Sequence, residues 1–349
     1  MDRLQWAFML HELLADFASF WADVQGSLAM PAPPNTDVLI EVSPGVAIDN
    51  ASLSERIGVA LLAMGAAVTR PFGNVGFSVG ARLVSKLFRS GKAVRVALAP
   101  DASFEMPYGD GYWSILLSRR ARYEADVEVA LLAFADIDFA FVDCGANYGY
   151  WSVLITSAKF GRHSAIAIEA APDTFGWLAR NAAANGRRFD VLNRAIAEHT
   201  GSKVTIRGAK HEARSIVPAG DAPVVGEVQT LALDDLLDRP ELRSVPHIVL
   251  KLDVEGVELA ALRGATRMME RDVLITYEDH GSDAAHAVSA HMLAEHGMRV
   301  FFIDGAGAME IVGLDQIEAI KRNRHRGYDF FATRSPFWAG RLEAIVRAR

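Results

Sequence analysis

The sequence contains a single cysteine, Cys144, among its 349 residues. One thiol cannot form an intrachain disulfide, and no C-x-x-C pair is present to bind a metal ion. The low cysteine content therefore excludes a disulfide framework and a cysteine-based zinc site, and it is typical of a protein from a reducing compartment.

Basic residues are in the minority, since 36 lysines and arginines face 43 aspartates and glutamates, for a formal net charge of −7. Nucleic-acid-binding proteins usually present a basic surface, so we expect no nucleic-acid partner. His286, His291 and His296 are spaced by five residues and do not share one helix face. We therefore predict no metal site.

Long hydrophobic runs are also missing. The longest apolar stretch, residues 57–69, is too short to cross a bilayer as a helix. Residues 1–24 include Asp2, Glu12, Asp16 and Asp23, which interrupt the apolar run that a secretory signal needs. We therefore expect a cytoplasmic protein.

The sequence does have enough apolar material for a large core. Hydrophobic residues make up 51% of the chain and charged residues 23%, a composition that excludes global disorder. The length allows one large domain with an extension, or two smaller domains.

Residues 1–95 are predicted to form an accessory extension that is mainly helical. Apolar residues recur at helical spacing over 3–24, and Ser52 with Glu55 forms a capping box that begins a helix ending near Thr69. Four basic residues lie among the apolar residues of 57–89. Two roles fit this composition: contact with a membrane surface or lipid-linked acceptor, and a helical cap that completes the core.

Residues 96–335 show short apolar runs that alternate with helical patterns. This order predicts a doubly wound α/β domain with a mostly parallel, seven-stranded sheet covered on both faces, followed by a C-terminal tail at 336–349. The predicted sheet strands are 139–143, 165–169, 189–193, 248–253, 273–278, 299–303 and 329–333, after two further strands at 94–98 and 102–106. The predicted helices are 121–134, 150–159, 172–185, 257–269 and 284–296.

The segment from Asp143 to Gly149 joins a buried strand to a helix through a glycine turn. Ligands of open α/β sheets bind at such a turn, where the strand order reverses. The dinucleotide fingerprint is G-x-G-x-x-G, but its second glycine position holds Asn147 and its third holds Tyr150. We therefore expect a ligand without pyrophosphate, with Asp143 suited to the ammonium of a methionyl group. A turn that needs glycine for geometry alone is the alternative.

The next predicted strand ends in Glu169, more than 20 residues after Asp143. An acidic side chain at this place accepts hydrogen bonds from a ribose diol. A surface carboxylate stabilised by a helix N-terminus is the alternative, which the paired spacing of Asp143 and Glu169 disfavours.

Two further strand ends carry candidates for catalysis. Asp253 should lie beside the glycine turn, and Lys251 within the same apolar strand requires an ion-pair partner such as Asp143, Asp253 or Glu255. His280 follows the next strand and is a candidate general base, with a solvated loop histidine as the alternative.

Together these motifs resemble the FkbM-type methyltransferase family over about residues 120–335. Residues 1–95 fall outside the resemblance. The matching segments are Asp143-Cys144-Gly145-Ala146-Asn147-Tyr148-Gly149, Ile168-Glu169, Thr230-Leu231-Ala232-Leu233-Asp234-Asp235-Leu236-Leu237, Lys251-Leu252-Asp253-Val254-Glu255-Gly256-Val257-Glu258 and Leu262-Arg263-Gly264-Ala265.

The resemblance implies a class I, Rossmann-like methyltransferase that uses S-adenosylmethionine. It further implies O-methylation of a hydroxyl on a sugar, glycan or glycolipid, or on a polyketide-like small molecule. A catalytically silent cofactor-binding module is a third interpretation, which the joint presence of Asp143, Glu169 and Asp253 disfavours. We expect catalysis from Asp253 and His280. The expected cofactor-binding residues are Tyr123, Asp143, Gly145, Ala146, Asn147, Gly149, Glu169 and Ala195.

Overall fold

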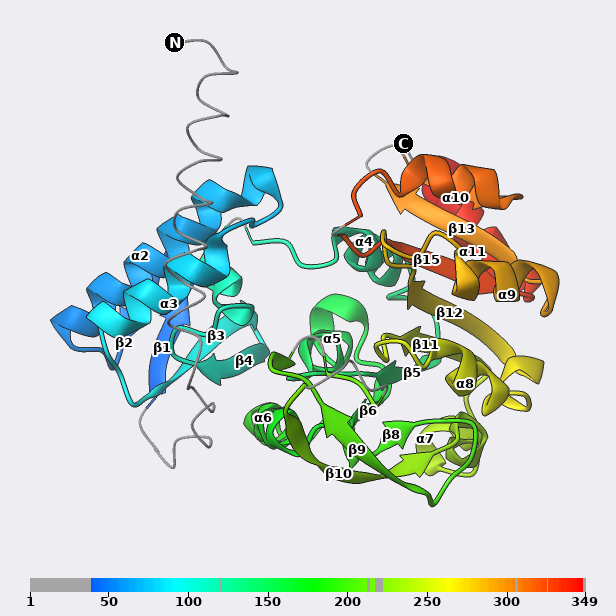
Figure 1. The fold of residues 1–349 in the computed structure, drawn as a ribbon, viewed down its shortest axis with the longest axis horizontal. Helices are drawn as coiled ribbons and strands as arrows, with labels where there is room; N and C mark the ends of the chain where they lie inside the picture. Colours follow the sequence, from blue (N-terminus) through cyan, green and yellow to red (C-terminus); the bar gives the residue numbers. More distant parts are fainter. Residues whose placement is uncertain are drawn as a thin grey trace, which may run out of the picture. The chain divides into compact units, whose positions relative to one another are not determined.

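The computed structural model describes residues 39–347 except 120, 212–213, 217–221, 305–306 and 325. All of these belong to one compact unit that begins at Asn35 (Figure 1). The helix predicted over 3–24 lies outside the described residues.

The main sheet confirms the predicted doubly wound α/β fold. Its strand order is β14-β13-β15-β12-β11-β5-β6-β7, and seven of these strands coincide with the seven predicted. The described sheet has eight strands, however, because β14 forms an antiparallel hairpin with β13 at the edge. The strands are β5 (Phe139–Cys144), β6 (Ser164–Glu169), β7 (Asp190–Asn193), β11 (His247–Leu252), β12 (Asp272–Glu278), β13 (Arg299–Asp304), β14 (Gly307–Ile311) and β15 (Asp329–Thr333).

Strand β5 lies inside the sheet, between β6 and β11, and is parallel to both. The chain runs outward from β5 to β7 and then returns to β11 on the other side, so the strand order reverses at β5. The pairing of Leu252 with Cys144 places the carboxyl ends of β11 and β5 side by side. This is the switch point at which such sheets bind ligands.

Both faces of the sheet are covered, as the continuous apolar strands require. Phe139 and Phe141 of β5 belong to one apolar cluster, while Ala140 and Val142 belong to another. Trp338, in the region predicted as a C-terminal tail, is fully buried in the first cluster. The helices are α4 (Ala125–Ala133), α5 (Tyr150–Ile155), α6 (Pro172–Ala184), α7 (Pro240–Arg243), α8 (Glu258–Arg263), α9 (Ala287–Ala294), α10 (Leu314–Ile320) and α11 (Pro336–Arg347).

The described part of the N-terminal extension contains a four-stranded sheet of order β2-β1-β3-β4, so the helical expectation is incomplete there. The predicted boundary after residue 95 falls inside β3, which pairs with β1 and not with the main sheet. The capping box of Ser52 and Glu55 is confirmed at the start of α2. The elements are β1 (Leu39–Ser43), β2 (Ala47–Asp49), α2 (Leu53–Thr69), α3 (Phe77–Leu87), β3 (Ala93–Ala99) and β4 (Ala102–Pro107).

A third, small sheet was not predicted. It has the order β8-β10-β9, with β8 (Ala195–Ile196), β9 (Lys203–Arg207) and β10 (Val224–Leu231). β9 and β10 are antiparallel, and the connection between them reaches the pocket described below.

Two asparagines, Asn181 in α6 and Asn185 directly after its last residue, join the main domain to the edge strand β4. Asn181 accepts from the Glu105 amide at 2.6 Å and donates to the Glu105 carbonyl at 3.0 Å. Asn185 makes the same pair of bonds with Ser103, at 3.0 and 2.7 Å. Residues four apart on the helix thus satisfy alternate backbone groups of the strand, and we call this pair the asparagine ladder.

Loss of the asparagine ladder should destabilise the fold. Asn181→Ala leaves a buried amide and a buried carbonyl of Glu105 unsatisfied, so we expect the free energy of unfolding to fall by about 1–3 kcal/mol. Urea denaturation measures this change. Glu318→Ala, on the exposed side of α10, is the control and should change it little; an equal loss in both variants would contradict the role of the ladder.

Candidate functional site

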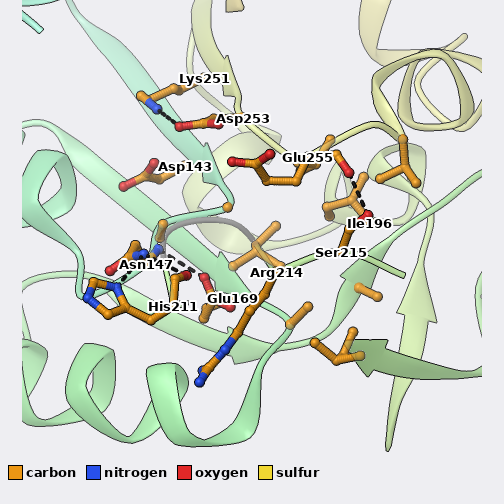
Figure 2. Close-up of a pocket in the computed structure, with 18 of the residues that line it drawn as sticks. Asp143, Asn147, Glu169, Ile196, His211, Arg214, Ser215, Lys251, Asp253 and Glu255 are labelled. Carbon is orange, nitrogen blue, oxygen red and sulfur yellow. Dashed lines mark hydrogen bonds and ion pairs between the residues drawn. The ribbon is translucent and has the colours of Figure 1, made fainter. Parts of the chain in front are cut away.

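A pocket that is partly open to solvent lies at the carboxyl ends of β5, β6 and β11 (Figure 2). Two of the ten predicted site residues, Gly149 and His280, do not line it. The predicted residues that line the pocket are Tyr123, Asp143, Gly145, Ala146, Asn147, Glu169, Ala195 and Asp253.

Gly145 allows two strand ends to meet closely. Its φ is +78°, and a Cβ added there would lie 1.7 Å from the carbonyl oxygen of Asp253. The amides of Gly145 and Ala146 both donate to the carbonyl of Ile168, at 3.0 and 2.9 Å. The turn after β5 is therefore held against β6 and β11 at once, and no larger residue fits.

Asn147 has a left-handed backbone with φ of 51°, which asparagine tolerates better than most residues. Its amide donates to Glu169 Oε2 at 3.0 Å, and its side-chain oxygen accepts from Trp113 Nε1 at 2.9 Å. The polar residue at the second position of the dinucleotide fingerprint therefore orders the turn.

Glu169 is a buried carboxylate at the end of β6. Its two oxygens accept from the amides of Asn147 and Ala171, the second at 2.8 Å. Burial raises the pKa of Glu169 to about 7 in spite of these two hydrogen bonds. The side chain is thus fixed in place at the pocket wall, and its charge is sensitive to a ligand that donates hydrogen bonds.

Lys251 supplies a buried positive charge to this end of the sheet. Its ammonium lies 2.8 Å from Asp253 Oδ2 and 3.7 Å from Glu124 Oε2, so the predicted ion pair with Asp253 is confirmed. Burial opposes the charge, but Asp253, Glu124 and Asp143 together raise the pKa of Lys251 well above its usual value.

Asp143, at the end of β5, is 2% exposed and accepts a hydrogen bond from Ser152 Oγ at 2.7 Å. Burial raises the pKa of Asp143 to about 6, although the charge of Lys251 acts to lower it. A cationic group that entered the pocket beside Asp143 would therefore stabilise its ionised form.

Several pocket residues were not predicted, because they come from segments without a sequence motif. His211, Arg214 and Ser215 belong to the connection between β9 and β10, and Tyr112 and Trp113 belong to the segment after β4. These segments are distant in the sequence from the strand ends of the main sheet. Only the folded structure shows that they line the same pocket.

The connection between β9 and β10 is tied to the pocket rim at several points. The His211 ring lies 3.1 Å from Asp110 Oδ2 through Nε2 and stacks on Tyr148 at 4.7 Å. The backbone carbonyl of His211 accepts from the Asn147 side chain at 3.1 Å. Ser215 Oγ donates to the carbonyl of Glu255 at 2.5 Å. The described residues of the connection thus contact opposite parts of the pocket rim (Figure 2).

Gly149 and His280 lie elsewhere. A Cβ on Gly149 would meet Leu178 Cδ1 at 2.5 Å, so this glycine allows the start of α5 to pack closely against α6. His280 is exposed, and its Nδ1 lies 2.6 Å from Ser282 Oγ. His280 follows β12, and β11 lies between β12 and β5. His280 therefore lies away from the glycine turn at the end of β5.

The pocket therefore combines a glycine turn with a carboxylate at the end of each of three neighbouring strands. Within the described ranges, no group of three or more histidine, cysteine or carboxylate side chains is arranged to hold a metal ion. The donors instead suit an organic ligand with an ammonium and a diol.

Comparisons with known proteins agree with the resemblance found in the sequence. Residues 143–300 match the sequence model of the family described as Methyltransferase FkbM domain. The hexuronic acid methyltransferase AglP of Haloferax volcanii is 27% identical to this chain over 183 residues, which are 51% of this chain and 70% of the relative.

Solved structures of similar proteins include methyltransferases at low identity. The methyltransferase FkbM of Methylobacillus flagellatus is 17% identical, with 61% of this chain and 56% of that chain covered and a TM-score of 0.33. The precorrin-6y C5,15-methyltransferase of Geobacter metallireducens is 14% identical, with 62% and 92% covered and a TM-score of 0.35. The assignment of the fold rests on the strand order above and not on these two.

Substitution of Gly145 should be strongly destabilising. In Gly145→Ala the new Cβ must displace the backbone of Asp253 or unwind the turn, so we expect a loss of about 3 kcal/mol or more in the free energy of unfolding. Thermal and urea unfolding measure it. Gly176→Ala in α6, where a Cβ meets no atom within 4 Å, is the matched control and should be neutral or stabilising.

Stability should depend on pH through Glu169. Its pKa rises from 4.5 to about 7 on folding, so the folded state holds more protons between these values and the free energy of unfolding falls as pH rises from 4.5 to 7. Glu169→Gln cannot ionise, so its free energy of unfolding should fall less over this range. The difference should be clearest between pH 6 and 7, because Asp143, with a pKa of about 6, titrates mainly below that range. Unfolding at a series of pH values, with the exposed Glu227→Gln as control, tests this, and equal slopes in all three proteins would contradict it.

Proposed function

We propose that the protein transfers a methyl group from S-adenosylmethionine to a hydroxyl of a sugar, glycan or glycolipid, and the match of residues 143–300 to the Methyltransferase FkbM domain supports this proposal. The observation that carries the proposal is the placement of Asp143, Glu169 and Asp253 around one glycine turn, at the ends of β5, β6 and beyond β11.

The residues present fit S-adenosylmethionine. The turn at Gly145 lets the backbone approach a ligand, and the buried Asp143 suits the ammonium of the methionyl group. Glu169, with both oxygens already oriented by backbone amides, suits the ribose diol. Ala195 and Ile196 add an apolar wall beside Glu169, which suits the adenine ring.

The sugar acceptor is supported by the similarity to a hexuronic acid methyltransferase. A polyketide-like small molecule remains the second acceptor class that the family resemblance implies. The silent-module interpretation is disfavoured by the complete set of strand-end carboxylates around the pocket.

Asp253 is the residue proposed to accept the proton of the acceptor hydroxyl. Its Oδ2 accepts a hydrogen bond from Lys251, and the residue lines the pocket. Lys251 acts through Asp253 and is a positioning residue. Holding acceptor oxygen, methyl carbon and sulfur in line can contribute about 7–11 kcal/mol to catalysis, and a base adds roughly 10²–10⁴ in rate.

The cofactor, when bound, supplies a methyl group on a cationic sulfur. With the cofactor bound, Asp253 would take the hydroxyl proton as the acceptor oxygen bonds to the methyl carbon, and the electron pair of the broken carbon–sulfur bond would stay on sulfur. A carboxylate against the sulfur would stabilise the cationic ground state more than the transition state. Asp253 is therefore proposed to face the acceptor.

The proposal predicts a separation of binding from turnover. With a hexuronic acid glycoside as acceptor, Asp253→Asn should lower turnover by about 10² while S-adenosylhomocysteine binding stays within a few-fold. His280→Ala, outside the pocket, is the control and should retain turnover.

Calorimetry with S-adenosylhomocysteine and formation of that product with acceptor measure the two effects. If the unmodified chain binds NAD and not S-adenosylhomocysteine, the cofactor assignment is wrong. If Asp253→Asn loses cofactor affinity in proportion to rate, Asp253 belongs to the cofactor site.

A further inference from the structure

Helix α2 is apolar on both of its sides. Its inward face, with Val59, Leu62 and Ala66, packs into the core. The opposite face exposes Leu53, Ile57, Met64 and Val68, of which Leu53 is 76% exposed and Val68 63% exposed. A helix that is apolar all round is normally covered on both sides or lies in a lipid environment.

Exposed apolar side chains also occur in the turn and the helix that follow α2. The turn that follows it exposes Phe72 and Val75 by 72% and 73%, and α3 exposes Leu83 and Leu87. The two helices pack side by side, with Phe77 of α3 in contact distance of the Gly65 position in α2 (Figure 1). We call this surface the α2–α3 face and define it by Leu53, Ile57, Met64, Val68, Phe72, Val75, Leu83 and Leu87.

The charged residues of the segment that forms the α2–α3 face are mostly basic, whereas the whole chain has more acidic than basic residues. Residues 53–92 contain six lysines and arginines and one acidic residue, whereas the full sequence has an acidic excess. The one acidic residue, Glu55, is buried and paired with Lys92. Among the described residues, no salt bridge neutralises Arg70 or Arg82, and Lys86 lies between Leu83 and Leu87 on the outer side of α3.

We propose that the α2–α3 face binds the surface of a bilayer that contains anionic lipids. Exposed leucine, methionine and phenylalanine side chains flanked by arginine and lysine are the pattern of an interfacial helix, which inserts its apolar side and pairs its basic residues with lipid phosphates. Within the described part of the chain, no helix is long and apolar enough to cross a bilayer, so the contact is with one leaflet. Charge complementarity favours anionic lipid over a second copy, because the same basic residues on two copies would repel each other.

Vesicle co-sedimentation of the full chain tests the proposal without reference to methyl transfer. The unmodified protein should bind vesicles of phosphatidylcholine and phosphatidylglycerol, bind phosphatidylcholine alone more weakly, and lose affinity as salt is raised. Leu83→Ser with Leu87→Ser should lower the partition coefficient by about tenfold or more. Arg70→Glu with Arg82→Glu should abolish the preference for the anionic lipid.

Matched controls lie on other exposed positions. Val224→Ser with Val312→Ser removes two exposed apolar side chains, 56% and 80% exposed, and Arg267→Glu reverses one exposed charge elsewhere. These variants should bind vesicles as the unmodified protein does. All variants should retain S-adenosylhomocysteine binding, because none of the changed residues lines the pocket.

Three outcomes would overturn the proposal. They are failure of the full chain to bind anionic vesicles, equal binding by the Leu83/Leu87 variant, and equal losses in the control variants. If light scattering instead shows a dimer that the Leu83/Leu87 variant dissociates, with no vesicle binding, the face is an interface between copies. A methyltransferase that is active but does not bind vesicles would leave the proposed function intact and refute this inference alone.

Discussion

The buried ammonium of Lys251 is the interaction on which the geometry of the site depends. It lies among Asp253, Glu124 and Asp143, side chains that would repel one another without it. Two further acids that are half-buried, Glu278 and Asp329, also interact with its charge. Removal of one partner from such a group leaves uncompensated buried charge, which costs more than the intact pairing contributes. The residues that follow β11 and the N-terminal end of α4, where Glu124 lies, are therefore held together by charge as well as by packing.

The segment that follows β4 and the main sheet together line the pocket. Tyr112 and Trp113 follow directly from β4, and Trp113 donates to Asn147 in the glycine turn. The buried Asp110 from the same segment accepts from the amide of Trp113 and contacts His211 from the connection between β9 and β10. The segment after β4 thus contributes walls to a site whose carboxylates lie at the ends of β5, β6 and β11.

Local sequence patterns predicted the main sheet and much of the pocket. Buried strands such as β5 and β11 appear in the sequence as largely apolar runs. Each is followed by an acidic or glycine-rich turn, which indicates where the strand order reverses. Short elements such as β2, with three residues, carry too little pattern to be recognised. His211 and Arg214 come close to the pocket only through contacts between distant segments, and His280 is kept from it by the order of the strands. Neither relation is encoded in local spacing.

The asparagine ladder has a consequence for the behaviour of the chain at high concentration. β4 is an edge strand of its sheet, and free amides and carbonyls along an edge are a template onto which a strand of another molecule can add. Asn181 and Asn185 occupy those groups at Glu105 and Ser103 from within the same chain. Other sheets protect such edges with bulges, prolines or inward-pointing lysines. Here side-chain amides occupy the free backbone groups, which disfavours self-association by strand addition.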